Sequence, residues 1–528
     1  MTLSKRRGKI GTVLGLSLLS FGVLLSSGSA YEFTVGGKPV SIMGYISQEA
    51  DYGLVKNKFE NQSGFNSFLT TALVEVEAKP SRNVSAFVSG SFEADWAYDI
   101  LKNNNQWNDK LFDRSRDHQY IRDDWQDLLK EAHVTYGAEH VYLRLGKQVV
   151  QWGETDGFVL ANLINPVDQR RGPTDVKFEH TIIPIWLVRA EYNTKVNSTV
   201  LQDLGLQFIL DPALQFRGNQ IVEAGNDRQG VFAPGVDLGA PVHLGSLHSK
   251  IDRPDNLDPK DFSYGLKLKG NIRGTLVNLL YFNGRDRDFA AHPLPIPPTV
   301  DPIANGFDGL PVIHPFQEGE FPKLRFVGLT ASGAFEGLKA SFLGGVAPVL
   351  RLEAIYAFDT TYGTNEMFDP AKFFWKTDEL RLALGVDWKV KINWLNPRAY
   401  FFISPQYFYQ RELDFPDSGD VANALIGGQP LTVTQRGSVP PALRENNHKS
   451  TLVVMTSYLH NKLAPLFFWS HDYTNQSDTW LGKLTYSPTQ SWDLGLGVFA
   501  LKASARGIGN DAMKNHDKLF ATVTYKFQ

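Results

Sequence analysis

The sequence contains no cysteine among its 528 residues. Disulfide scaffolds, Cys-ligated zinc or iron–sulfur sites, thiol nucleophiles and lipoprotein anchors are therefore excluded, because each requires a cysteine. Beyond the N-terminal region there is no run of about 18 apolar residues, which excludes a bundle of membrane-spanning helices. The formal net charge is only −3, which does not suit a nucleic-acid-binding protein. A large soluble β protein and a membrane β-barrel are the two classes that remain.

The first thirty residues have the layout of an export signal. Four basic side chains precede a mostly apolar run, Ile10–Leu25, and a stretch of small residues that ends at Ala30. This order predicts a signal peptide over residues 1–30, and an uncleaved anchor helix is disfavoured because the run is short and contains several Gly and Ser. Removing it leaves residues 31–528 with a formal charge of 49 − 56 = −7. An exported chain without cysteine fits the envelope of a Gram-negative bacterium.

A two-residue period dominates the rest of the chain. In Leu380–Val390 apolar side chains occupy every second position, and charged or small residues such as Arg381 and Asp387 lie between them. The segments 262–269, 350–359 and 518–527 repeat this pattern, which is typical of strands with one apolar face. Many of these segments approach the roughly 9–11 residues that a tilted strand needs to cross a bilayer, whereas soluble strands average about 5–6.

Aromatic residues gather near the ends of these predicted strands. Trp96, Trp152, Trp186 and Trp480 are examples, and this placement predicts two girdles at the membrane interfaces. The chain also ends on an aromatic-rich strand, although Gln528 follows the last aromatic residue, whereas the usual assembly signal ends on the aromatic itself. We therefore predict an all-β, transmembrane antiparallel β-barrel over residues 31–528.

The number of strands is predicted to be about sixteen, with fourteen and eighteen as alternatives. Nineteen segments have the pattern of a strand, but 204–210 and 338–346 are short or ambiguous, and bacterial single-chain barrels have even strand numbers. Four inserts interrupt the pattern and are predicted to be long extracellular loops of the barrel, near 103–130, 211–261, 285–322 and 413–448.

One insert has a helical pattern of its own. Residues 123–130 have an acidic start and then apolar positions, which predicts a short helix. Its role is either a plug that lines the pore or a turn on the surface, and the surface turn is favoured. Any of the other three inserts could fold inward and narrow the lumen.

The most distinctive segment is Leu143–Glu154, which contains Gly-Lys-Gln and Trp-Gly-Glu and is followed by Asn-Pro-Val-Asp at 165–168. It resembles the signature of a bacterial family known only as domain of unknown function thirteen-oh-two, with Lys147 in place of the usual Arg. The resemblance implies a single-chain outer-membrane β-barrel and a place in envelope transport systems for hydrophobic or aromatic compounds. Similar Trp-Gly-Glu segments occur in alginate-export and other substrate porins, so it implies no particular substrate.

The same segment supplies the first candidates for pore-lining residues. On a strand, Arg144, Gln148 and Glu154 share one face, and Arg144 should point into the lumen because a lipid-exposed Arg costs about 2–4 kcal/mol at the midplane. These residues could have a functional role, either lining a constriction or orienting an inward-folded loop. Alternatively Arg144 pairs with a lumenal carboxylate and braces the barrel, and bracing is favoured. The further candidates are charged residues on other presumed lumenal faces: Arg189, Glu191, Lys267, Lys269, Arg351, Glu353, Arg381 and Asp387. Their balanced signs give no charge selectivity.

Motifs for chemistry are scarce. The sequence has no Gly-x-Ser-x-Gly elbow, no His-Glu-x-x-His helix and no phosphate-binding loop. We therefore predict no enzyme, no catalytic residue, no cofactor and no metal. His243 and His248 lie near Asp252, Asp255, Asp258 and Asp261, but a solvated acidic loop is favoured there over a divalent-ion site.

The combined pattern predicts a porin-like channel for the passive passage of a small molecule. It does not decide whether this molecule is hydrophobic or aromatic. Its expected surroundings are outer-membrane lipid, lipopolysaccharide and a small-molecule solute, with no nucleic acid. Two alternatives remain: a structural sleeve around a periplasmic or electron-transfer partner, and, less favoured, an envelope hydrolase.

Overall fold

A computed structural model describes the chain over most of its length. The described residues are 31–54, 64–100, 128–154, 160–168, 181–196, 198–220, 243–244, 248–301, 312–314, 316–339, 344–364, 366–415, 425–426, 429–430, 445–474, 476–502 and 517–527. The predicted signal peptide, residues 1–30, lies outside them.

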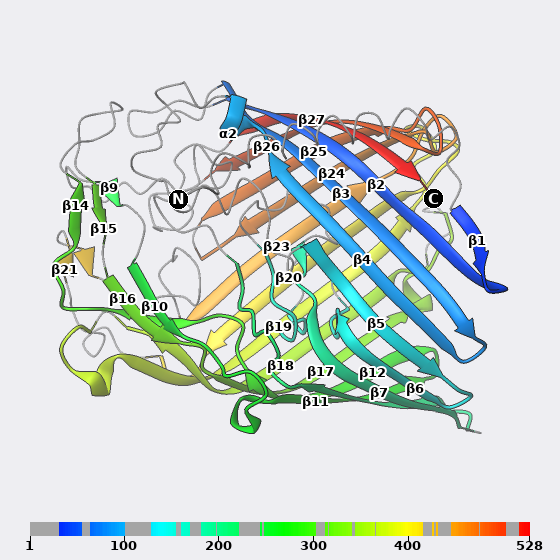
Figure 1. Cartoon of the computed structure of the whole chain (residues 1–528). Helices are drawn as coiled ribbons and strands as arrows, with labels where there is room; N and C mark the ends of the chain where they lie inside the picture. Colours follow the sequence, from blue (N-terminus) through cyan, green and yellow to red (C-terminus); the bar gives the residue numbers. More distant parts are fainter. Residues whose placement is uncertain are drawn as a thin grey trace.

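Nearly all the long strands belong to one closed antiparallel sheet. The sheet has nineteen strands, and the eighteen that remain when β1 is set aside form a ring, because β27 pairs with β2. The ring strands are β2 (Lys38–Gly53), β3 (Gly64–Ser81), β4 (Val84–Asp95), β5 (Leu129–Gly137), β6 (Val141–Gln148), β7 (Ile185–Lys195), β8 (Leu201–Asp211), β11 (Ser263–Ile272), β12 (Thr275–Arg285), β17 (Lys323–Ala334), β18 (Val349–Gly363), β19 (Phe374–Val390), β20 (Phe401–Glu412), β23 (Asn446–Met455), β24 (Leu463–Asp472), β25 (Ser477–Tyr486), β26 (Trp492–Lys502) and β27 (Lys518–Phe527). They follow one another around the wall in chain order (Figure 1).

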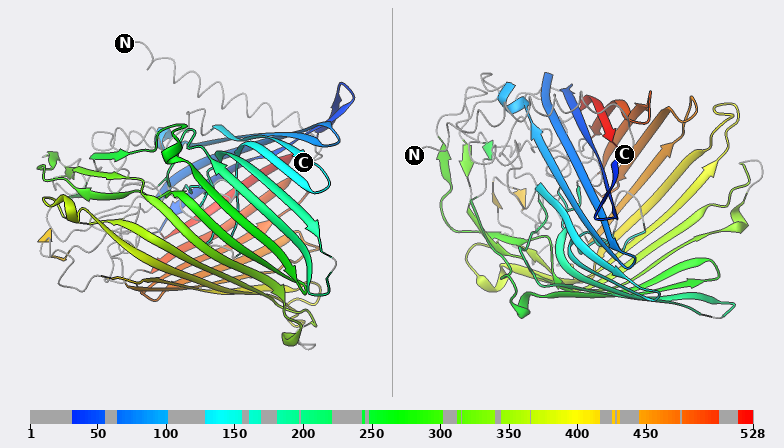
Figure 2. Two further views of the ribbon diagram at one scale, coloured as in Figure 1. Left: turned by 90° about the horizontal axis from the view of Figure 1, so that it is seen from below. Right: turned by 45° about the vertical axis from the view of Figure 1, so that its right-hand side comes forward.

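The two ends of the barrel differ. At one end β1 (Tyr31–Val35) pairs with the start of β2 and projects past the wall (Figures 1 and 2). Small sheets gather at the opposite end, where they are built from β9 (His243–Leu244), β10 (His248–Asp252), β13 (Ala290–Pro293), β14 (Thr299–Asp301), β15 (Val312–His314) and β16 (Phe316–Glu320). The remaining short elements are β21 (Leu425–Ile426), β22 (Gln429–Pro430), α2 (Ala97–Ile100) and the 3-10 helices Pro259–Asp261, Glu336–Leu338 and Pro370–Lys372.

The alternation of the sequence separates the two faces of the wall. On β19, Leu384 is 55% exposed on the outside, whereas its neighbour Ala383 is fully buried on the inside. On β8, Leu206 is exposed and Gln207 is buried in the same way. The wall therefore has an apolar outer face and a lumenal face that carries polar and charged groups. No helix among the described residues is long and apolar enough to span a membrane.

The predicted number of sixteen strands is wrong, and the closed ring has eighteen. Of the two ambiguous segments, 204–210 is a genuine ring strand, because it lies within β8 and pairs with both β7 and β11. The other, 338–346, contains no strand in its described part, where Glu336–Leu338 instead forms a 3-10 helix. The sequence predicts a helix over 123–130. Its last two residues belong to a strand instead, because β5 begins at Leu129, and residues 123–127 lie outside the described part of the chain.

Candidate functional site

The chain leaves the barrel wall at the end of β6. Gly146 has a φ of +133°, and a Cβ atom there would lie 2.2 Å from the carbonyl oxygen of Ala132. Two residues later the strand ends at Gln148, and β7 does not begin until Ile185. The described residues between them include 149–154 and 160–168, which we call the inward segment.

The inward segment lies against the lumenal face of several strands, and an apolar core fills the contact between the segment and these strands. Trp152 is its centre: the side chain is fully buried and its ring meets the edge of Phe326 of β17 at a centroid distance of 6.4 Å. Gly265 of β11 makes room for this indole, because a Cβ atom there would lie 2.5 Å from it. The core consists of Val150, Trp152, Ala161, Ile164, Ile185, Leu187, Ile209, Leu280, Phe282, Leu324, Phe326, Ile355 and Ala357. The segment is thus packed inside the barrel against the wall from β7 to β18.

Two asparagines bond to the backbone that has left the sheet. The side-chain oxygen Oδ1 of Asn162 accepts from the backbone N–H of Trp152 at 2.7 Å and of Gly153 at 2.9 Å. Asn165 accepts from the N–H of Val150 at 2.8 Å and donates to the carbonyl of Ile183 at 3.0 Å. A buried backbone group needs such a partner once it has lost its sheet neighbour. The two halves of the sequence signature therefore bond to each other.

Strand β18 holds the far end of the inward segment. Glu353, which is fully buried, accepts from the backbone N–H of Glu154 at 2.6 Å and of Ala161 at 3.0 Å. Arg351, two residues earlier on β18, donates to the carbonyl of Glu154 at 2.5 Å and pairs with Asp387 of β19. One carboxylate and one guanidinium thus bind three backbone groups of the segment.

A chain of polar contacts joins Trp152 to the wall below it. The indole N–H donates to Gln207 at 2.6 Å, and the amide of Gln207 donates to Glu191 at 2.7 Å. Glu191 also binds Lys269 at 2.7 Å and pairs with Arg189. The indole is therefore fixed by its N–H as well as by its apolar contacts.

The Asn-Pro-Val-Asp part of the signature has its own anchor. Arg287, which is buried, donates to the carbonyl of Ile164 at 2.8 Å and pairs with Asp211 at the end of β8 at 2.5 Å. The N–H of Val167 donates to Asn219 at 2.8 Å. These bonds hold residues 164–167 beside the first residues that follow β8 and β12.

The structure places all the predicted pore-lining residues on the lumenal side, most of them in two groups. Glu154, Arg351, Glu353 and Asp387 come together at the end of the inward segment. Arg189, Glu191 and Lys269 form the ion-pair cluster under Trp152, in the same part of the wall as Arg144 and Lys267. Arg381 lies apart from both groups and pairs with Glu379 at 2.5 Å. Gln148 is buried and donates to the carbonyl of Leu187 at 3.1 Å. That these residues line a pore stays a prediction.

Sequence reasoning missed several residues of this site. The sequence pattern places Trp152 in an interfacial girdle, and this prediction is wrong because the side chain is fully buried inside the barrel. The assumption of one strand through Glu154 caused the error, since the strand ends at Gln148. Asn162, Gln207 and Gly265 carried no signal of their own, because their roles depend on strands distant in sequence. The spacing between the two halves of the signature was the one available indication.

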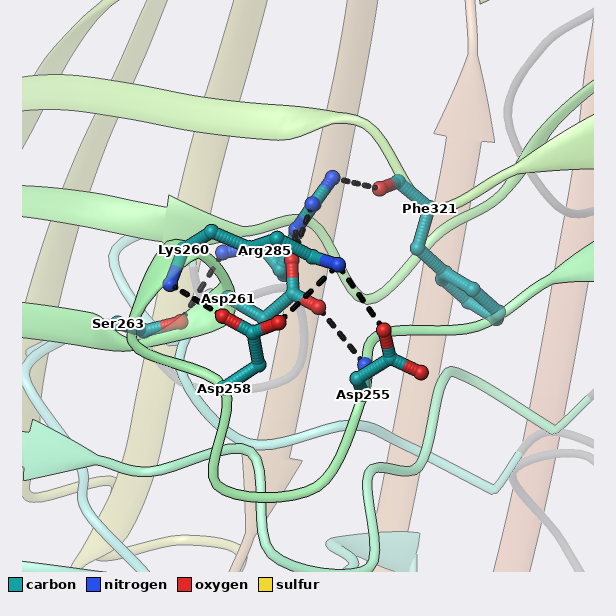
Figure 3. A network of polar contacts seen from close by, with 7 residues as sticks. All are labelled: Asp255, Asp258, Lys260, Asp261, Ser263, Arg285 and Phe321. Atoms are coloured by element: carbon teal, nitrogen blue, oxygen red, sulfur yellow. Dashed lines mark hydrogen bonds and ion pairs between the residues drawn. The ribbon is translucent and has the colours of Figure 1, made fainter.

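The acidic loop before β11 is held by cations and backbone amides (Figure 3). Lys260 contacts Asp255 at 3.0 Å and Asp258 at 3.1 Å, and Arg285 pairs with Asp261. Arg285 also donates to the carbonyl of Phe321 at 3.0 Å. Within the described residues no group of three or more His, Cys, Asp or Glu is arranged to hold a metal ion.

This loop gives a prediction for acidic pH. The backbone N–H and the ammonium of Lys260 hold the pKa of Asp258 below its usual range. A carboxylate with a lowered pKa stabilises the folded loop above the unfolded value of about 3.9, and this contribution is lost as pH falls through the lower folded value. We expect a carboxyl-carbon NMR titration of Asp258 to have its midpoint below about 3.9, and Lys260→Gln to raise that midpoint only in part, because the backbone bond remains. A midpoint at or above the ordinary value would contradict the arrangement.

The closed ring and the segment packed inside it define a large antiparallel β-barrel. The chain belongs to the family described as "Protein of unknown function (DUF1302)", whose model matches residues 47–527. This confirms the resemblance drawn from the sequence signature. No curated protein matches the chain.

Several solved structures match most of the chain at low identity and with TM-scores below 0.5. OccAB4 of Acinetobacter baumannii is 9% identical with a TM-score of 0.45, over 92% of this chain and 97% of that one. OccAB1 of the same organism is 9% identical with a TM-score of 0.44, over 95% and 98% of the two chains. OmpF of Salmonella typhi, solved in complex with daunomycin, is 11% identical with a TM-score of 0.36, over 94% and 100%.

Proposed function

We propose that the protein is a passive channel for small molecules in the outer membrane of a Gram-negative bacterium. The observation that supports this most is the closed ring of eighteen strands with an apolar outer face and a polar lumenal face. Barrels of about 16–18 strands are too wide for their own wall side chains to fill, so they leave an aqueous lumen. The apolar outer face would contact lipid and lipopolysaccharide.

The inward segment would set the size limit of this channel. It occupies the lumenal face from β7 to β18 and is fixed there by Trp152, Asn162 and Glu353. The lumenal face of β2, β3 and β4 carries instead polar residues such as Ser47, Thr71 and Ser91. A solute would pass between this polar wall and the inward segment, with the predicted pore-lining residues near its path.

Planar-bilayer recording of the purified, folded protein tests the channel. We expect discrete conductance steps that scale with salt concentration, as diffusion through a water-filled lumen requires. The same preparation after heat denaturation serves as the control. A correctly folded barrel that inserts into the bilayer and carries no current would refute the proposal.

A pair of matched substitutions tests the membrane position. Leu384→Arg places a charge near the middle of β19 on the outer face, where an Arg at the bilayer midplane costs about 2–4 kcal/mol. We expect urea unfolding in lipid vesicles to show this loss of free energy of unfolding. Leu338→Arg adds the same charge at another exposed leucine, which lies outside the ring strands, and it should have little effect. Equal effects of the two substitutions would argue against a lipid-facing β19.

A further inference from the structure

Two arginines face each other on the lumenal wall. Arg144 of β6 and Arg189 of β7 are direct cross-strand partners. Their guanidinium carbons lie 5.4 Å and 5.5 Å from the centre of the Tyr142 ring. Like charges directly opposite each other destabilise a sheet unless counter-charges compensate them. Arg189 has such a counter-charge, because it pairs with Glu191.

Arg144 has no comparable partner. Its Nε donates to the hydroxyl of Thr135 at 3.0 Å, and among the described residues no carboxylate forms an ion pair with it. Its two terminal amino groups therefore keep their bonding capacity, although the sequence had favoured a paired arginine. A guanidinium can bind both oxygens of a carboxylate through such parallel donors.

Lys267 brings a further cation to the same part of the wall. Lys267 lies opposite Gln207, which in turn lies opposite Glu191. Within the described part of the chain the ammonium group of Lys267 forms no ion pair. Arg144, Arg189, Lys267 and Lys269 together form what we call the basic patch. The contact from Gln207 to Trp152 at 2.6 Å places this patch directly against the inward segment.

The carboxylates near the patch do not balance it. Glu191 is shared between Arg189 and Lys269. Glu131 accepts from the backbone N–H of Val149 at 3.3 Å, and Glu154 accepts from Asn278 at 3.2 Å. Among the described residues, these three carboxylates stand against the four cations of the patch, which leaves an excess of 4 − 3 = one positive charge. This excess charge, and a guanidinium fork without an ion-pair partner in the described part of the chain, suit a monoanion with two oxygens.

We infer that the basic patch is a binding site for an organic monocarboxylate beside the inward segment. This rests on the proposed function and deepens it by naming the class of solute. The carboxylate binds the terminal amino groups of Arg144, with Lys267 as the second cation. The site selects an anion over a neutral molecule of the same size where the lumen is narrowed.

Uptake into liposomes tests the inference with two solutes of similar size, gluconate and sorbitol. We expect the wild-type protein to admit gluconate faster than sorbitol. Arg144→Gln should lower the ratio of gluconate uptake to sorbitol uptake by about tenfold, the effect of losing one charge-assisted contact. Arg144→Lys keeps the charge but loses the fork, so gluconate uptake should fall by a smaller factor. Arg325→Gln is the matched control, since Arg325 is half-exposed and pairs with Asp359 away from the patch.

The possible results separate the two proposals. Each variant is first checked for a folded barrel by its heat-modifiable migration in electrophoresis. Equal uptake of gluconate and sorbitol by the wild type, or equal behaviour of Arg144→Gln and Arg325→Gln, would overturn the carboxylate site and leave the channel intact. Inorganic phosphate entering as fast as gluconate would overturn the assignment to a carboxylate. No uptake above that of empty liposomes would overturn the channel itself, and the site with it.

Discussion

Replacing Trp152 with alanine should lower the free energy of unfolding by about 3–5 kcal/mol, the usual cost of removing a large aromatic side chain from a packed core. The indole is fully buried between the inward segment and the wall, and the twelve other residues of the core pack with it. Its removal would also leave Gln207 without the indole N–H that it accepts at 2.6 Å. Urea unfolding followed by circular dichroism measures the loss.

The matched control for this variant is Trp394→Ala. Trp394 is 83% exposed and lies in the connection between β19 and β20, so its removal should change stability by no more than about 0.5 kcal/mol. The two variants should also differ in planar bilayers, where a loosened inward segment makes the current of Trp152→Ala noisier and larger. Similar stability losses in both variants would mean that the indole does not hold the segment.

The prediction for Trp152 also shows which features of the structure the sequence alone can predict. The alternation of apolar and polar positions was enough to predict the barrel, because it depends only on neighbours along the chain. The strand number depends on weaker segments such as 204–210, which the sequence pattern leaves ambiguous but which lies within β8. Its ambiguity arises because a strand in a sheet is selected by its pairing partners as much as by its own residues.

The site was less predictable for a related reason. Gly146 gave no sign that the chain would leave the wall two residues later, since a glycine inside a strand pattern has several explanations. The two-residue period alone predicts charged residues on the lumenal face. It does not predict the groups that they bind, because Arg351 and Glu353 contact a segment almost 200 residues earlier in the chain. Gly265 had no local signal at all, since its role is set by the indole that lies against it.

Glu353→Gln should release the far end of the inward segment. Both carboxylate oxygens accept a backbone N–H, from Glu154 and Ala161. A glutamine side chain has one accepting oxygen, and its amide nitrogen can only donate, so one buried N–H loses its partner and faces another donor. We expect the free energy of unfolding to fall by about 1–3 kcal/mol, the cost of an unsatisfied buried polar group. Glu336→Gln, at an exposed residue that pairs with Lys339, should be neutral.

Because the chain contains no cysteine, a single introduced cysteine can report on the position of the inward segment. Ala161 is fully buried, so a single cysteine introduced there should react with a maleimide only when the segment moves away from the wall. Labelling of Ala161→Cys should be slow in the otherwise unchanged protein and faster by an order of magnitude when combined with Glu353→Gln, since a stability loss of about 1.4 kcal/mol raises an open population tenfold. The combination with Glu336→Gln should label as slowly as Ala161→Cys alone. Unchanged labelling alongside a loss of stability would show that Glu353 supports β18 rather than the inward segment.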